Sequence, residues 1–232
     1  MTKLLAALDP GPGAKPVLAT AMAIGGVVGA VVEPLYEPDT RGFEQLIRLA
    51  ASEEVAVVVI GLRRTEARSR ALRRSLGAVA ASVGKPVAVV PPEAPASSTL
   101  WRVLVLVDPR LSALYAPRSA IRLAAGASLE LVVLQVHDEI GNRTTYEKAQ
   151  ARELVRRFCP SGLESITLER RVGSAEEVVP HVARELGVDL IALGWAAPLE
   201  ELRAPVVEAT LSRAPIPLLL LPLQPASLRA VS

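Results

Sequence analysis

Eight continuous apolar runs divide the chain and predict buried β-strands. Parallel strands that are covered on both faces are apolar throughout and do not alternate with polar residues. Stretches with apolar residues at helical spacing lie between the runs, such as the one that contains Phe43, Leu46 and Ala50. Alternating strands and helices predict parallel sheets with right-handed crossovers. The predicted strands are residues 4–8, 27–32, 55–60, 86–90, 103–107, 129–136, 189–193 and 217–221.

Three segments of the first half recur in the second half in the same order. Each pair keeps an apolar strand and its marker residues: Asp-Pro after the first strand, Gly at the end of the second, and Pro on both sides of the third. Three matched strands in one order indicate two copies of one α/β unit. The matched segments are 3–10 with 102–109, 55–61 with 188–194, and 85–91 with 216–222.

The second copy is longer than the first. Its additional stretch holds a predicted helix at 143–158 and a predicted strand at 165–172, in which apolar and charged residues alternate. The segment 91–98, rich in proline and small residues, separates the copies. We therefore expect a shortened α/β domain at 1–95 and a complete one at 100–225.

These motifs resemble the universal stress protein family. The order of a strand ending in Asp, a strand ending in Gly and a last strand that opens with Pro-Val agrees with it, as does the pair of segments 173–179 and 187–194. The resemblance implies two tandem doubly wound, Rossmann-like parallel sheets. It also implies that the halves pack as an intramolecular pseudo-dimer through the strands at 86–90 and 217–221. Such a chain could be a monomer. The unpaired sheet edge of the shortened half favours the alternative, a further homodimer.

The candidate ligand sites follow the strands. In an open parallel sheet, ligands bind beyond the carboxyl ends of the strands, where the strand order reverses. Asp9 and Asp108 follow the first strand of each copy, and Gly61 and Gly194 end the matching later strands. His137 lies after the second strand of the second copy.

The resemblance also implies a way to bind phosphate. In ATP-binding members of the family, the Asp holds the nucleoside, and a loop of the form Gly, two residues, Gly, nine residues, Gly-Ser/Thr wraps the phosphates. Only the first half keeps this spacing, with Arg64 and Arg74 in place of the second and third glycines, before Ser75. A bound ATP or AMP should therefore lie between Asp9 and Gly61, with both arginines and the serine at its phosphates.

Each candidate residue also has an ordinary structural explanation. The two Asp residues could start turns or cap helices, and the glycines could serve tight turns between strand and helix. His137 could lie on the surface, and Cys159 could simply end a helix before Pro160. A single cysteine excludes an intrachain disulfide, which agrees with a cytoplasmic location.

The basic run from Arg63 to Arg74 has three interpretations: an anion contact, a nucleic-acid contact, or a helix face that is solvated or forms an interface. The run lacks interleaved aromatic residues, and the net charge is only +2, so we expect no nucleic-acid partner. The uncharged segment 17–32 is shorter than a membrane span and is broken by Gly25-Gly26, so we expect no membrane segment.

Composition argues against catalysis. With two histidines, one cysteine and no paired-carboxylate motif, the sequence predicts neither a nucleophile-and-base pair nor a metal centre. The leading hypothesis is a non-enzymatic regulatory or stress-response protein that acts through an unidentified protein partner or a small ligand. The alternative is an adenine-nucleotide binder with at most slow hydrolysis, which uses the first-half site. No cofactor is certain on these grounds.

Overall fold

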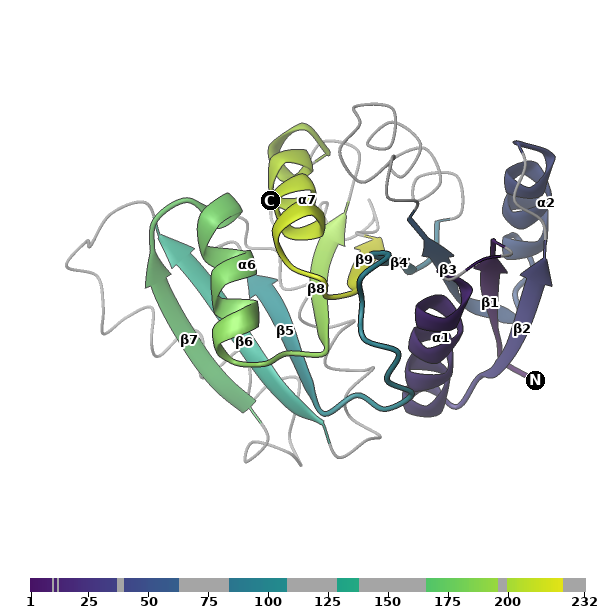
Figure 1. Cartoon of the computed structure of the whole chain (residues 1–232), viewed down its shortest axis with the longest axis horizontal. Coiled ribbons are helices and arrows are strands. Elements are labelled where there is room, and N and C mark those ends of the chain that lie inside the picture. Colours follow the sequence, from purple (N-terminus) through teal and green to yellow (C-terminus); the bar gives the residue numbers. More distant parts are fainter. Residues whose placement is uncertain are drawn as a thin grey trace, which may run out of the picture.

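All strands of the described chain belong to one nine-stranded sheet (Figure 1). The computed structural model describes residues 1–9, 11, 13–36, 40–62, 84–107, 129–137, 166–195 and 200–222, with backbone only at 40–43 and 200–204. The strand order is β2-β1-β3-β4-β9-β8-β5-β6-β7. The strands are β1 (Lys3–Leu8), β2 (Val31–Tyr36), β3 (Val55–Gly61), β4 (Val87–Val90), β5 (Arg102–Val107), β6 (Glu130–His137), β7 (Ile166–Val172), β8 (Leu190–Trp195) and β9 (Leu218–Pro222).

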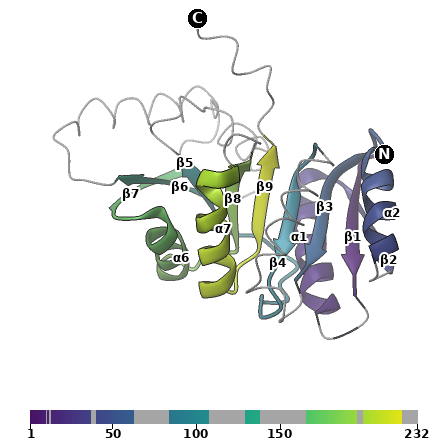
Figure 2. The same cartoon turned by 90° about the horizontal axis from the view of Figure 1, so that it is seen from above.

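One antiparallel contact joins the two halves of this sheet. Among the described strands, every neighbouring pair runs parallel except β4 and β9, whose arrows point in opposite directions in Figure 2. Their register places Ala88 opposite Leu219, and both side chains are buried. We call this contact the β4–β9 seam. It is the pairing of last strands that the sequence predicted.

Among the described residues, the second half contains one strand more than the first half. Its strand order is β9-β8-β5-β6-β7, whereas the first half has only β2-β1-β3-β4. The additional strand β7 confirms the strand predicted at 165–172. The helix predicted at 143–158 lies outside the described residues. As a consequence, β2 forms the outer edge of the first half, whereas β7 forms the outer edge of the second half.

Helices cover both faces of the sheet. Helix α1 (Ala14–Val28) packs on the face that carries Leu4, Ala6, Val57 and Val59. Three helices belong to the opposite face, with Val58, Ile60 and Leu193. They are α2 (Thr40–Ala50), α6 (Ala175–Glu185) and α7 (Glu200–Arg213). Because strand side chains alternate between faces, each central strand supplies both cores, which explains the continuous apolar runs.

The bounds of the strand predicted at 27–32 are wrong. Helix α1 continues through Gly25 and Gly26 to Val28 and ends at Gly29. The φ of Gly29 is +64°, the left-handed conformation that glycine adopts readily. The N–H of Gly29 donates to the carbonyl of Gly25. The strand begins only at Val31, and β2 is half-exposed rather than buried. Apolar periodicity alone does not separate a buried helix from the strand that follows it.

Helix α6 has no side-chain cap at its amino end and contains a proline in its interior. Ser174 has an extended backbone, and its side chain makes no capping hydrogen bond. Pro180 lies inside the helix and cannot donate to the carbonyl of Glu176. Arg213 of α7 donates to this carbonyl instead, over 3.4 Å from Nη1 to O. Gly187, with a φ of +59°, follows the end of the helix.

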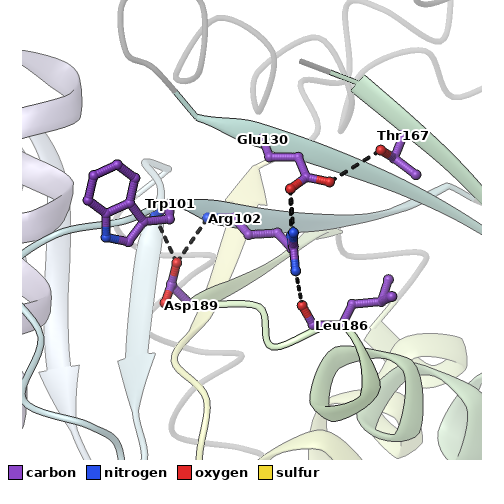
Figure 3. A network of polar contacts seen from close by, with 6 residues as sticks. All are labelled: Trp101, Arg102, Glu130, Thr167, Leu186 and Asp189. Atoms are coloured by element: carbon purple, nitrogen blue, oxygen red, sulfur yellow. Dashed lines mark hydrogen bonds and ion pairs between the residues drawn. The ribbon is translucent and has the colours of Figure 1, made fainter. Parts of the chain in front are cut away.

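A polar network ties the linker to the amino ends of the second-half strands (Figure 3). Asp189 Oδ2 accepts hydrogen bonds from the backbone N–H groups of Trp101 at 2.7 Å and Arg102 at 2.9 Å. The Arg102 guanidinium binds Glu130 Oε2 through Nε at 2.7 Å and Nη2 at 2.6 Å. It also donates to the carbonyl of Leu186. The network therefore connects the linker exit, β5, β6 and the end of α6.

The first half carries a simpler version of this arrangement. Lys3 is the first residue of β1. Its Nζ lies 3.2 Å from Glu54 Oε2 and 3.5 Å from Glu33 Oε2. The hydrogen bond with Glu54 and the negative charge of Glu33 raise the pKa of Lys3. These groups are exposed, so the ion pairs add little stability.

We expect Asp189→Ala to lower the free energy of unfolding by about 1–2 kcal/mol, because two backbone N–H groups lose a charged acceptor. Water can reach part of this site, which keeps the loss at the low end. Asp189→Asn retains an oxygen acceptor and should lose less. Urea unfolding followed by circular dichroism measures both variants, and an unchanged midpoint for Asp189→Ala would contradict the assignment.

Candidate functional site

The first-half candidate site lies where β1 and β3 end side by side. The register of these neighbouring strands places Ala7 beside Ile60, so Asp9 and Gly61 come together at the same edge of the sheet. Asp9 is half-buried directly after β1, and Gly61 is the last residue of β3. The crossovers that leave β1 and enter β3 run over opposite faces, through α1 and α2. This is the point at which the strand order reverses, and open α/β sheets usually bind ligands beyond such a point.

The amino end of α1 faces the same loop region. The helix begins at Ala14, after Gly13 at its N-cap, and no side chain caps it. Its first turn contains no acidic residue. The N–H of Ala14 donates to the carbonyl of Gly11 at 3.1 Å, and Pro16 has no N–H, so the helix dipole rather than a set of free donors favours negative charge at this end.

Gly61 has a packing reason to be glycine. A Cβ atom added to it would lie 2.7 Å from Cγ2 of Val17 in α1, closer than side-chain carbons approach one another. Val17 is 2% exposed and belongs to the core between α1 and the sheet. The glycine therefore lets α1 lie close against the end of β3. The sequence offered a tight turn as the structural explanation for this glycine, whereas the structure gives a packing contact.

The second-half candidate site contains buried polar atoms. Gly194 is buried in β8, and His137 ends β6 with its carbonyl accepting the N–H of Gly173 at 2.9 Å. His137 Nε2 and Nε1 of Trp195, the last residue of β8, are buried without a hydrogen-bond partner in the described part of the chain. The indole was missed by sequence reasoning, although an aromatic residue directly after a strand-ending glycine was visible.

The two candidate sites do not meet. Because β4 and β9 run antiparallel, the carboxyl ends of the first-half strands lie at the opposite edge of the sheet from those of the second half. The structure thus brings Asp9 and Gly61 together and keeps His137 and Gly194 apart from them. The remaining predicted site residues lie outside the described residues: Arg64, Arg74, Ser75 and Asp108.

A small cavity of about 50 Å³ lies between the halves, at a place that the sequence did not indicate. Its lining includes Thr20 of α1, Ser97 and Thr99 of the linker, and Asp189 before β8. Four segments that are distant in the sequence form it, which leaves no local motif to recognise. Small-molecule sites usually measure about 300–1,000 Å³, so this cavity does not fit a nucleotide.

Two further properties concern only the described residues. No group of three or more His, Cys, Asp and Glu side chains among them is placed to hold a metal ion. None of their helices combines the length and apolar character that a membrane crossing requires.

Solved structures show the same fold. A universal stress protein from Archaeoglobus fulgidus superimposes with a TM-score of 0.64 at 15% identity, covering 97% of each chain. A putative universal stress protein from Pseudomonas aeruginosa gives 0.61 at 16% identity, covering 96% of this chain and 93% of the other. A sequence search among curated proteins found no match.

The model of the universal stress protein family matches residues 101–222. The matched range contains the second half of the sheet, from β5 to β9. It spans more than half of the 232 residues. The chain therefore belongs to the universal stress protein family.

Proposed function

We propose that this chain is a non-enzymatic regulatory or stress-response protein, which acts through a protein partner or a small ligand. The packing of Gly61 against Val17 carries the proposal. In ATP-binding members this glycine begins the phosphate loop, whereas here the close approach of α1 accounts for it. Arg64 and Arg74 replace the two later glycines, and their Cβ atoms hold the main chain farther from a phosphate. We place the protein in the cytoplasm.

The two halves, 1–95 and 100–225, would act as one unit in this proposal. The β4–β9 seam gives each half a paired last strand. A surface for a protein partner can then extend over both halves. A homodimer of the whole chain would add a second contact to the one at the seam.

The second candidate function is weak binding of ATP or AMP, with at most slow hydrolysis. It is favoured by the convergence of Asp9, Gly61 and the uncapped amino end of α1 at one edge of the sheet. In this proposal Arg64 and Arg74 contact the phosphates by charge-assisted hydrogen bonds, and Ser75 adds its hydroxyl. Guanidinium groups would replace part of the missing backbone cradle.

Gly61→Ala should lower the free energy of unfolding by about 1–3 kcal/mol, because its methyl group collides with Val17. In the background of Val17→Ala, the loss of unfolding free energy that Gly61→Ala causes should be smaller by at least about 1 kcal/mol, because the colliding methyl group of Val17 is gone. A double-mutant cycle by urea unfolding measures this coupling. Gly26→Ala, where an added Cβ meets nothing within 4 Å, is the matched control and should not destabilise. Additive losses at Gly61 and Val17 would refute the packing explanation.

Calorimetric titration with ATP separates the two functions. The regulatory proposal without nucleotide expects no heat and no nucleotide in native mass spectra of freshly purified protein. The nucleotide proposal expects a Kd in the micromolar range or weaker, or about −8 kcal/mol at best. Arg64→Ala/Arg74→Ala should then abolish most of the heat. Unchanged binding in this double variant would show that ATP binds elsewhere.

A further inference from the structure

The open edge of the sheet lies at β2, on the outside of the shortened half. Figure 1 shows β2 as the last strand on this side, and no described strand pairs with its outer edge. In the second half, β7 covers the corresponding edge of β6 from Leu131 to His137. An edge strand presents unpaired N–H and C=O groups to which another chain can add.

The register of β2 determines which of its main-chain groups face outward. The N–H of Val31 donates to the carbonyl of Thr2 at 2.9 Å, and the register with β1 continues without a shift. In a parallel ladder, the residues that bond a given neighbour alternate along the strand. Inward-facing main-chain groups therefore belong to Val31, Glu33 and Leu35, and outward-facing ones to Val32, Pro34 and Tyr36.

Pro34 is the middle one of the three outward positions. It has no N–H, so the outer edge lacks its central donor, while the inner ladder to β1 loses nothing. The rest of the strand favours pairing. Val31 and Tyr36 are 49% and 68% exposed, and the carboxylate of Glu33 is paired with Lys3.

We propose that Pro34 prevents β2 from pairing with the strand of a second copy of this chain. The opposite edge strand, β7, is protected by its charged residues Glu169, Arg170 and Arg171. The two outward donors that remain on β2 are four residues apart, or about 13 Å, with a gap between them. A homodimer of the chain would accordingly use another surface than the spare edge that the sequence favoured.

Pro34→Val tests the proposal, since it restores the central donor and raises the preference for a strand. Light scattering after size exclusion should show about a twofold or higher mass at concentrations at which the wild-type protein keeps its own mass. Pro34→Ala should act in the same direction but more weakly, because alanine favours strands less. Wild-type mass for both folded variants, up to the highest soluble concentration, would overturn the proposal.

Moving the proline to another outward position distinguishes the effect of the missing N–H from the effect of the new side chain. Val32→Pro in the background of Pro34→Val removes a neighbouring outward N–H but leaves adjacent donors at positions 34 and 36, so it should lower the mass toward the wild-type value. If Pro34→Val precipitates, recovery of soluble protein in the double variant supports the proposal, and continued precipitation counts against it. Glu33→Pro removes an inward N–H and should instead lower the unfolding midpoint, whereas an unchanged midpoint would contradict the assigned register.

Discussion

The arrangement of the whole sheet depends on the antiparallel pairing of β4 with β9. Each half ends in a short, buried strand, and the seam satisfies the edge that each would otherwise expose. Because this contact reverses the strand direction, the strands of the two halves have their carboxyl ends at opposite ends of the sheet. The interaction that holds the halves together therefore keeps their candidate sites separate. A ligand at Asp9 and Gly61 would therefore share no contacts with Gly194 or His137.

Most strands could be predicted because strands buried on both faces are apolar throughout, and marker residues such as Gly61 and Gly194 repeat at their ends. The boundary between α1 and β2 could not be predicted, because one apolar run crosses both elements. Gly25 appeared to break the helix, yet an added Cβ there would lie 3.0 Å from the carbonyl of Ala30 and 3.1 Å from Cγ2 of Val32. This glycine allows the strand to return close to the helix. Its role depends on a contact made only after the turn has formed.

The candidate site was predictable in position but not in detail. The order of the strands places Asp9 beside Gly61, as the resemblance to the family implied. The contact of Gly61 with Val17 depends on how α1 crosses β3, which no local pattern encodes. The same holds for Asp189, whose carboxylate accepts two N–H groups from the linker exit far away in the sequence. Packing and main-chain contacts over long distances therefore account for what sequence reasoning missed.

The shortened first half keeps the strands that surround its switch point. The reversal of strand order needs only β1, β3 and the crossovers on opposite faces, and all of these are present. A counterpart of β7, which the described part of the first half lacks, would lie beyond β2, so its absence leaves the switch point unchanged and exposes an edge instead. Proline is compatible with that edge because only an outward-facing N–H is removed. Pro34 thus lies where a strand tolerates it and where a second strand would need a donor.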